Sequence, residues 1–461
     1  MKRFVFTFLS AALLCLSQGK VTPVGDWSGT LDVGGQKLRI VFHIKEQAGN
    51  LTATFDSPDQ GGKDIRALGI GRDGTALKID MPNGATFEGV IADAPGKTFN
   101  NEIVGRLRQS GGQYPLTLKR MSAAELAASK PKRPQIPAKP YPYDEREVTA
   151  ANKSAPGVTL ACTLTVPRGN GPFPAVLTIT GSGPQERNEE VMGHPVFLVL
   201  ADHLTRKGIA VMRCDDRGIG KSKGEFRKAT TADFATDVQA EFDVLKTQPK
   251  IDPKRCGLIG HSEGGVIAPM VASRRPDVAF IVMMSGTGVR GRDVILSQKE
   301  AILKANGMQK VDVSADRAVY DAAIAGKDAS AIAAAGKGMF PPGTPDDVVK
   351  QQLTTMLSPW FVYFLKYDPA PALAKVKQPV LALFGEKDLQ VIPSVNEPAV
   401  RTALKNNKNA SIQTVPGVNH LYQTAQTGSP TEYPKIEETI SPKALNLISD
   451  WILSVAGKPR Q

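Results

Sequence analysis

The sequence predicts an α/β fold, a doubly wound and mostly parallel sheet with a helical cap insertion, preceded by a small all-β barrel or sandwich domain. Two patterns lead to this prediction. From about residue 146 onward, near-continuous apolar runs alternate with helical segments, as in parallel sheets that are covered on both faces. Before residue 122, polar and apolar residues alternate between turn pairs, which indicates short antiparallel strands. The length of 461 residues is enough for two or three domains.

The first 19 residues have the composition of a secretory signal peptide. A positive start, Met1-Lys2-Arg3, precedes an uncharged apolar core over residues 4–16 and small residues that allow cleavage after Gly19. A core of about 13 residues is too short to cross a bilayer. Cys15 would suit a lipoprotein, but the bulky Leu14 precedes it. We therefore predict an exported protein, periplasmic or secreted, without membrane insertion once the leader is removed.

Residues 20–121 are predicted to form the all-β domain. Apolar and polar side chains alternate over residues 38–44, and turn pairs such as Asn83-Gly84 recur along this stretch. A proline-rich segment then favours a stiff, extended linker over residues 122–145. Its prolines are Pro131, Pro134, Pro137, Pro140 and Pro142.

Residues 146–461 are predicted to form the α/β domain. Its strand-like runs lie at residues 175–179, 209–212, 256–259, 279–284 and 380–384. Between residues 289 and 375 the strands stop and Ala-rich helical stretches take over. An insertion between two strands at this point is expected to form a cap over the carboxyl edge of the sheet, where open α/β sheets bind their ligands.

Neither the cysteines nor the charge points to a metal, a cofactor or a nucleic acid. Without the leader, the cysteines are Cys162, Cys214 and Cys256, an odd number without metal-binding spacing, which we interpret as buried small hydrophobes rather than a disulfide framework. The net charge of +12 is spread along the chain, and its densest run, at residues 130–133, contains no aromatic residue to stack on bases. No cofactor, metal or nucleic-acid partner is therefore predicted, and no pattern specifies an oligomeric state.

The strongest functional pattern is Gly260-x-Ser262-x-Gly264, which follows an apolar strand and opens a helical run. This is the context of a nucleophile elbow, a sharp strand-to-helix turn that projects a serine hydroxyl above the sheet. The turn strains the serine backbone, so neighbours without a Cβ avoid clashes, and Gly265 lets the helix approach the sheet. The alternative is a glycine-rich turn with an idle serine.

A serine nucleophile needs a general base, and the base needs an orienting carboxylate. Of the five histidines, only His420 follows Ser262 in the chain, and it lies where a strand ends in a glycine-containing loop. The side chain of His261 is expected to point away from its neighbour Ser262. Asp388 follows an apolar strand and is the predicted carboxylate, with Glu386 as its rival.

Two backbone N–H groups are candidates for an oxyanion hole. One belongs to Glu263, directly after the nucleophile, and the other to Ser182, in the run Thr180-Gly181-Ser182-Gly183 after an early strand. For the second position, a plain glycine-rich turn is the alternative.

These residues resemble the α/β-hydrolase superfamily, in which serine, acid and histidine follow in this order, and the resemblance covers residues 146–461. The chain is also similar to secreted bacterial serine esterases with a small N-terminal β domain. The similar segments are Gly181-Ser182-Gly183-Pro184-Gln185 and Asn419-His420-Leu421-Tyr422-Gln423. The resemblance implies a serine carboxylesterase that cleaves small-molecule esters with short acyl chains through an acyl-enzyme.

The sequence does not specify the leaving group of the substrate, because the same residues cleave thioesters and peptide bonds on related folds. An exported thioesterase or aminopeptidase is therefore the alternative. A peptidase that recognises a free amino terminus needs an acidic residue that faces the site, and the cap offers Asp312, Asp316, Asp321, Asp346 and Asp347. A third possibility is a non-catalytic protein whose β domain binds carbohydrate or lipid. There Trp27 is either a core anchor or a stacking platform, and the complete Ser, Asp and His set argues against this possibility.

Overall fold

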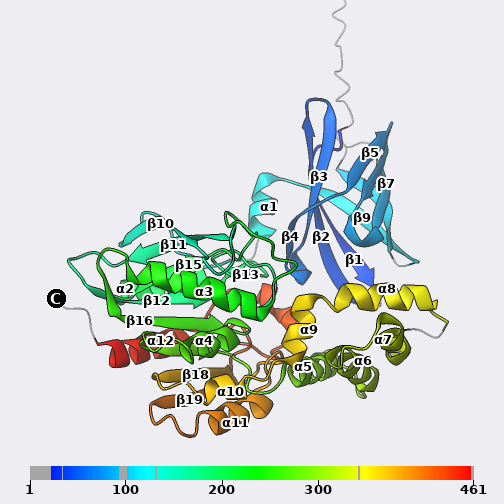
Figure 1. The fold of residues 1–461 in the computed structure, drawn as a ribbon. Coiled ribbons are helices and arrows are strands. Elements are labelled where there is room, and N and C mark those ends of the chain that lie inside the picture. The colour runs from blue at the N-terminus through cyan, green and yellow to red at the C-terminus, as the bar shows by residue number, and fades with distance from the viewer. Residues whose placement is uncertain are drawn as a thin grey trace, which may run out of the picture. The chain divides into compact units, whose positions relative to one another are not determined.

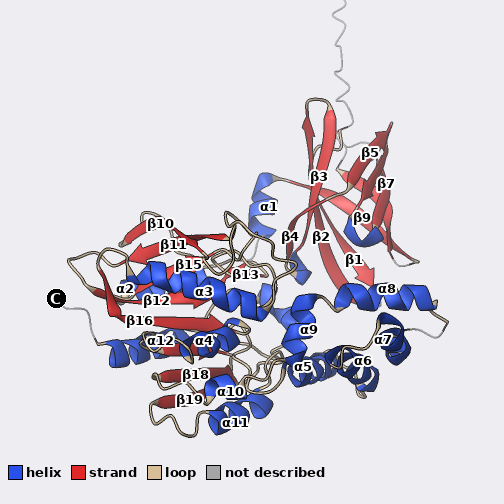
Figure 2. Ribbon diagram, viewed as in Figure 1, coloured by secondary structure: helices blue, strands red, loops and turns tan. Residues whose placement is uncertain are grey.

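The computed structural model describes residues 22–33, 35–92, 101–109, 111–129, 132–340 and 343–457. The chain forms two compact units, Met1–Lys130 and Pro131–Gln461 (Figure 1, Figure 2). The predicted leader lies outside the described residues. Within the described ranges, no helix combines the length and the apolar character that a membrane span requires.

The N-terminal unit is one antiparallel sheet that curls around its apolar side (Figure 1). The strand order is β4-β3-β2-β1-β9-β8-β7-β6-β5, and β3 contacts β5 from the opposite end of this order. The unit is therefore closer to a barrel than to a sandwich of two sheets. Its strands are β1 (Gly25–Val33), β2 (Gln36–Gln47), β3 (Asn50–Ser57), β4 (Gly62–Arg66), β5 (Gly69–Asp73), β6 (Ala76–Asp80), β7 (Thr86–Ala92), β8 (Glu102–Gln109) and β9 (Gly112–Met121), with the short 3-10 helices η1 (Pro58–Gln60) and η2 (Pro82–Gly84).

The core of this unit is built from the inward-facing half of the alternating pattern. Trp27, Phe42 and Phe87 are fully buried in it, and each such side chain contributes roughly 1.5–3 kcal/mol through its removal from water. The indole Nε1 of Trp27 donates a hydrogen bond to the carbonyl of Pro23 at 2.7 Å. Trp27 is therefore a core anchor and not an exposed stacking platform.

The C-terminal unit contains an eight-stranded sheet in the order β10-β11-β15-β12-β16-β17-β18-β19. The pairs β10–β11 and β11–β15 are antiparallel, and the pairs from β15–β12 to β18–β19 are parallel. The central strands are buried on both faces, which explains their near-continuous apolar sequences. The strands are β10 (Asp144–Ala151), β11 (Thr159–Val166), β12 (Phe173–Ile179), β15 (Ala210–Cys214), β16 (Ile251–His261), β17 (Ile281–Met284), β18 (Val380–Gly385) and β19 (Ala410–Val415).

Helices cover both faces of this sheet, so the predicted doubly wound arrangement is confirmed. On one face, α3 (Thr231–Lys246) and α4 (Gly264–Ala272) bury their apolar sides against the strands. On the other face, α2 (Val196–Arg206) and α12 (Pro442–Ala456) do the same. The remaining elements are α11 (Pro393–Ala403), the 3-10 helix η4 (Pro430–Lys435) and the short hairpin of β13 (Glu190–Val191) and β14 (His194–Pro195).

A helical cap is inserted between β17 and β18, as the sequence predicts. Val319, Tyr320 and Leu353 are buried in an apolar cluster that belongs to the cap itself, which explains how this Ala-rich stretch folds without strands. The insertion comprises α5 (Gly291–Ala305), α6 (Ser314–Ile324), α7 (Ala329–Gly336), η3 (Lys337–Met339), α8 (Asp346–Met356), α9 (Pro359–Lys366) and α10 (Ala370–Leu373).

The predicted linker, residues 122–145, is divided between the two units. Its first part forms α1 (Ala123–Ser129) of the N-terminal unit. Further on, Arg133 is tied to the C-terminal unit, because its guanidinium donates to the carbonyls of Pro434 at 2.9 Å and Ile436 at 3.0 Å. Proline spacing predicts extended backbone, but it carries no information about such anchoring side chains.

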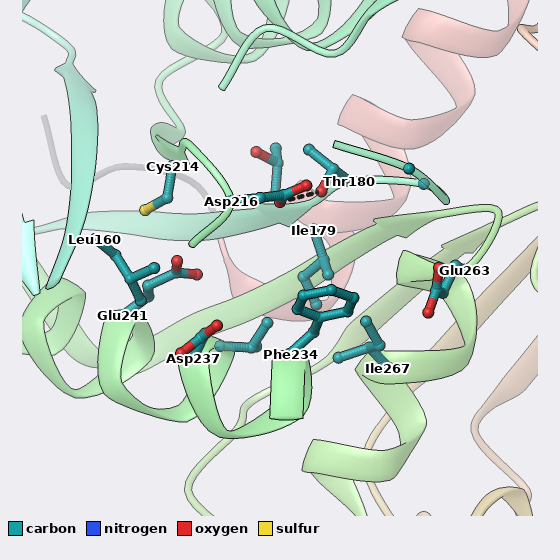
Figure 3. A pocket seen from close by; sticks show the side chains of 14 residues that line it. Leu160, Ile179, Thr180, Cys214, Asp216, Phe234, Asp237, Glu241, Glu263 and Ile267 are labelled. Atoms are coloured by element: carbon teal, nitrogen blue, oxygen red, sulfur yellow. Dashed lines mark hydrogen bonds between the residues drawn. The ribbon is translucent and has the colours of Figure 1, made fainter. Parts of the chain in front are cut away.

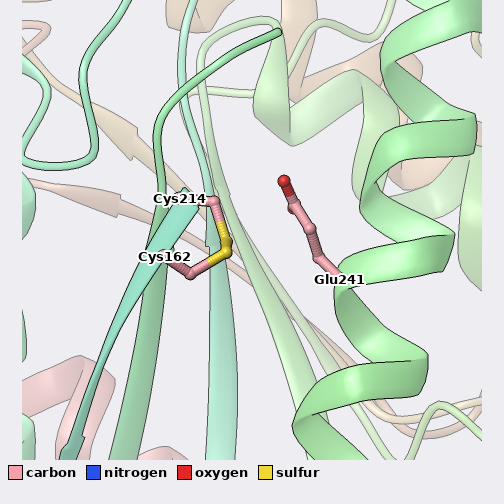
Figure 4. A group of neighbouring side chains, drawn as sticks. All are labelled: Cys162, Cys214 and Glu241. Carbon is pink, nitrogen blue, oxygen red and sulfur yellow. A yellow bond between two sulfur atoms is a disulfide. The ribbon is translucent and has the colours of Figure 1, made fainter. Parts of the chain in front are cut away.

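A disulfide joins Cys162 of β11 to Cys214 of β15 (Figure 4). The interpretation of these two cysteines as free hydrophobes was therefore wrong, whereas Cys256 is free and buried. The two half-cystines are direct cross-strand partners, since β15 lies between β11 and β12 in the sheet order, and a separation of 52 residues hides this pairing in the sequence. The Glu241 carboxylate lies within 4.8 Å of both sulfurs, but a disulfide offers no thiolate to a metal.

We expect the disulfide to stabilise the C-terminal unit substantially. Closing a loop of 52 residues limits the unfolded chain, and this effect is worth about 4 kcal/mol in the chain-entropy treatment. The double variant Cys162→Ala/Cys214→Ala should lose roughly that free energy of unfolding in urea titrations. A reductant should destabilise the parent protein by a similar amount and leave the double variant unchanged. A reductant that destabilises both proteins equally would contradict this prediction.

Candidate active site

Ser262 lies in a strand–turn–helix, between the end of β16 at His261 and the start of α4 at Gly264. Its φ of 53° falls in the left-handed region, which costs a non-glycine residue of order 1–3 kcal/mol and persists only where the surroundings enforce it. The glycine positions are steric requirements. A Cβ on Gly260 would lie 1.9 Å from the carbonyl oxygen of Gly264, and one on Gly264 would lie 2.0 Å from that of Ile179.

His420 and Asp388 are brought together by the loops that follow β19 and β18. The Nδ1 of His420 lies 2.8 Å from Oδ2 of Asp388, and both side chains are buried. The other carboxylate oxygen, Oδ1, accepts the backbone N–H groups of Gln390 and Val391, each at 2.8 Å. Burial raises the pKa of Asp388, but the facing imidazole and these hydrogen bonds outweigh burial, so that the pKa lies below its ordinary value.

Glu386, the rival carboxylate, takes no part in this pair. Its side chain is exposed, and its Oε2 accepts the backbone N–H of Gly417 at 2.7 Å. The structure therefore places Asp388, and not Glu386, against His420.

Ser262, His420, Ser182 and Glu263 line one cavity of about 260 Å³. This volume is at the small end for an enzyme pocket. The cap contributes the apolar part of the wall, and two residues from the loop after β18 complete that side. These residues are Val294, Ile295, Trp360 and Phe364 from the cap, with Gln390 and Val391 from the loop.

Both predicted oxyanion donors border this cavity, and both are free to donate. Within the described part of the chain, the backbone N–H groups of Ser182 and Glu263 donate to no other protein atom. The neighbouring N–H of Gly181 is already used, since it donates to Oε1 of Glu189 at 2.6 Å. A developing oxyanion beside Ser262 could thus find two unpaired donors.

The Glu263 side chain links the elbow to the cap. Its Oε1 accepts hydrogen bonds from Trp360 Nε1 on α9 at 2.8 Å and from Thr231 Oγ1 at the start of α3 at 2.6 Å. The nearby hydroxyl of Ser182 favours the ionised form of the same carboxylate. Burial raises the pKa of Glu263 in spite of these donors. A cap residue almost 100 positions away therefore helps to hold an oxyanion donor.

Two residues of the site were missed from the sequence. His261 is not turned toward solvent. Its Nδ1 lies 2.9 Å from Oε1 of Glu189, and its Nε2 lies 3.0 Å from the backbone oxygen of His420. Glu189 is one of three acidic residues in the run after the glycine-rich loop, with Glu186 and Glu190, and sequence offers no signal as to which of them is buried.

The chain is similar to several known proteins. The profile of the family described as "Serine aminopeptidase, S33" matches residues 195–334. Esterase EstD of Thermotoga maritima is 24% identical over 315 residues, which are 68% of this chain and 68% of the relative. A solved esterase of Pyrococcus furiosus has a TM-score of 0.45 at 15% identity, with 71% of this chain and 99% of that protein covered. A solved proline iminopeptidase of Mycobacterium smegmatis has a TM-score of 0.41 at 15% identity, with 68% and 99% covered.

The sheet order, the elbow at Ser262 and the family match agree. The C-terminal unit has the α/β-hydrolase fold. In this hydrolase, the strained turn, the buried Asp388–His420 pair and the two free N–H groups all lie at the carboxyl edge of the parallel strands, where open α/β sheets carry their sites.

A second, smaller cavity lies behind the oxyanion loop of the hydrolase (Figure 3). Its volume of about 30 Å³ has room for a water molecule. Glu241 and Asp216 line it, and Thr180 Oγ1 donates to Oδ1 of Asp216 at 2.8 Å. The backbone N–H of Gln185 donates to Oδ2 at 2.9 Å. Removal from water raises the pKa of Asp216 to about 7, and the nearby charges of Glu263 and Glu189 add to this shift.

We expect Asp216 to make the folded hydrolase less stable as the pH rises. The folded pKa of about 7 exceeds the unfolded pKa, so the folded state binds the extra proton and its stabilisation is lost as pH rises through that value. Asp216→Asn mimics the protonated form, because its amide can donate to Thr180 while its oxygen accepts from Gln185. Between about pH 5 and about pH 8, the free energy of unfolding of the parent protein should fall by roughly 2 kcal/mol more than that of this variant, as measured by urea unfolding. Equal losses in both proteins would contradict the prediction.

Proposed function

We propose that this hydrolase is a serine carboxylesterase that cleaves esters with short acyl groups through an acyl-enzyme on Ser262. The observation that carries the proposal is the single cavity into which Ser262, His420 and the two free N–H groups open. This set supplies a nucleophile, a base and an oxyanion hole, which are the parts that acyl transfer needs.

The proposed reaction follows from the placement of these groups. His420 Nε2 takes the proton of Ser262 Oγ as the oxygen attacks the ester carbonyl, and Asp388 holds the opposite ring nitrogen and stabilises the resulting cation. The N–H groups of Ser182 and Glu263 hold the oxyanion. His420 then gives its proton to the departing alcohol. A water molecule, activated by the same base, hydrolyses the acyl-enzyme.

Short acyl esters are favoured by the size and the wall of the cavity. A volume of about 260 Å³ bounded by apolar cap residues suits a small acyl group and leaves little space for a long chain. The name of the Thermotoga maritima relative, an esterase, supports ester hydrolysis.

An aminopeptidase, the activity in the family description, is less well supported, because it must hold a positive amino group. The cavity lining in the described part of the cap includes none of the five predicted aspartates. Asp316 and Asp321 instead form ion pairs with Lys299 and Arg292. The acids that do line the cavity already accept donors of the protein, since Oε1 of Glu263 accepts from Trp360 and Thr231 and Oε1 of Glu189 accepts from Gly181 and His261.

The test compares leaving groups on one acyl series. We expect p-nitrophenyl acetate and butyrate to be cleaved with a far higher kcat/KM than p-nitrophenyl palmitate or amino-acid p-nitroanilides. The matching acetyl and butyryl thioesters form a third arm. Preferential turnover of the anilides or of the thioesters would replace this proposal with one of the alternatives.

We also propose that the protein is exported. The predicted leader motivates this proposal, and a buried disulfide is typical of proteins from oxidising compartments. Cell fractionation of the full-length protein, and of a variant that lacks residues 2–19, should find the activity outside the cytoplasm only for the former. The expected substrate is a small-molecule ester, without a nucleic-acid partner.

A further inference from the structure

Glu189 connects the oxyanion loop to the strand that carries the nucleophile. Its side chain is 1% exposed, and one oxygen, Oε1, accepts both the backbone N–H of Gly181 at 2.6 Å and Nδ1 of His261 at 2.9 Å. Its own backbone has a φ of 49°, a strained conformation for a glutamate. The Glu189 carboxylate is thus held in a fixed position behind the oxyanion loop.

His261 extends this connection to the general base. Its Nε2 lies 3.0 Å from the backbone oxygen of His420, and the two imidazole rings lie 4.7 Å apart between centroids. Gly181, Glu189, His261 and His420 therefore form one continuous chain of hydrogen bonds. These bonds connect the oxyanion loop, through the residue before Ser262, to the backbone of the base.

The partners of His261 define its protonation. A carboxylate faces one ring nitrogen and a carbonyl faces the other, and neither of these groups can donate a hydrogen bond. When the carboxyl is ionised, both ring nitrogens donate, and the ring is an imidazolium in an ion pair with Glu189. Burial lowers the pKa of His261, but the charge and hydrogen bond of Glu189 outweigh burial, and the pKa lies above its ordinary value.

The pair is costly to bury. Among the described residues, no protein group donates to Oε2 of Glu189, which borders the cavity. A buried ion pair adds little net stability compared with apolar side chains of similar volume, so stability alone does not explain this pair. The loop between β12 and β13 could have held Gly181 with a neutral side chain.

We infer that Glu189 and His261 are a positioning pair, which holds the oxyanion loop and the backbone of His420 in a fixed relation to Ser262. This inference rests on the proposed acyl-transfer function. By occupying the N–H of Gly181, Glu189 leaves the next N–H, that of Ser182, to face the cavity. By holding the backbone oxygen of His420, His261 sets the distance of the base from the nucleophile. The pair touches no reacting atom.

The test uses the full chain and four variants. Glu189→Gln removes the anion, His261→Gln removes the cation, and a third variant combines the two changes. Glu190→Gln makes the same change one residue further along, at an exposed carboxylate, and serves as the matched control. Folding is measured by circular dichroism and urea unfolding, and kcat and KM are measured with p-nitrophenyl acetate.

We expect kcat to fall about 100-fold in each single variant, because a displacement of about 1 Å in reacting groups has effects of this size. KM should stay within about threefold, since ground-state binding does not use the oxyanion hole. An alkyl trifluoromethyl ketone, which forms a tetrahedral adduct with serine, should bind more weakly by the same factor as kcat falls. The double variant should be no worse than the poorer single variant, because both residues act as one unit. Glu190→Gln should behave as the parent protein.

Several outcomes would overturn the inference. These are an unchanged kcat in both single variants, a loss confined to KM, a loss that only follows the unfolded fraction, or losses that add in the double variant. Failure of the ester proposal can be distinguished from failure of the positioning role, because a fluorophosphonate labels an activated serine whatever the natural substrate of the enzyme is. If the parent protein is labelled but cleaves no ester, labelling of Ser262 should still slow by a similar factor in both variants. Unchanged labelling would overturn the positioning role.

Discussion

Ser262→Ala should abolish ester hydrolysis, with kcat lower by about 10⁴- to 10⁶-fold, because the acyl-enzyme of the proposed reaction forms on this hydroxyl. The oxyanion donors are backbone N–H groups and remain in place. KM should therefore change little, and the residual rate should still exceed that in buffer. Steady-state kinetics with p-nitrophenyl acetate measure the loss, and fluorophosphonate labelling followed by peptide mapping locates the nucleophile.

The fold of this variant should be intact. Alanine keeps the Cβ that Ser262 already carries at a φ of 53°, so the strain of the turn is unchanged and the free energy of unfolding should match that of the parent protein. Cys256→Ala is a useful comparison, since it alters a buried residue of the same strand outside the cavity and should keep the acyl-enzyme chemistry. Full activity in Ser262→Ala, or labelling at another serine, would end the catalytic proposal.

The parts of the fold and site that could be predicted from the sequence are those with a local signal. The elbow is one, because a buried strand, two sterically required glycines and a helix start lie within a few residues of Ser262. The cap is another, since it interrupts the alternation of strands and helices. His420 and Asp388 followed from chain order and from their positions after strands, and the structure brings them together.

The remaining features depend on the order of strands in space, which residue spacing does not encode. Cys162 and Cys214 became partners only because β15 lies beside β11 in the sheet. In the same way, Glu189 reaches His261 across 72 residues and Trp360 reaches Glu263 across 97. For His261, the expectation that it points away from Ser262 left its partners unspecified, and these partners came from two distant loops.

Asp388→Asn should lower kcat by about 10⁴-fold, through the wrong tautomer of the base rather than through lost structure. The change of tautomer follows from the hydrogen-bond partners of Asp388. Two backbone N–H groups, those of Gln390 and Val391, occupy Oδ1, so the oxygen of the new amide must take that place and accept from them. Its NH₂ group then faces Nδ1 of His420. Because an amide NH₂ can only donate, Nδ1 must become an acceptor and the ring proton moves to Nε2, where it blocks removal of the Ser262 proton.

Glu386→Gln provides the matched control for this tautomer effect. That side chain is exposed and accepts the N–H of Gly417, which a glutamine oxygen can also do, so kcat should be unchanged. Nitrogen chemical shifts of labelled His420 should report the proton on Nδ1 in the parent protein and on Nε2 in Asp388→Asn, with similar unfolding curves for the two. A large loss in Glu386→Gln with little loss in Asp388→Asn would reverse the assignment of the orienting carboxylate. Loss of activity with the parent tautomer retained would mean that Asp388 acts mainly through its negative charge on the imidazolium formed during the reaction.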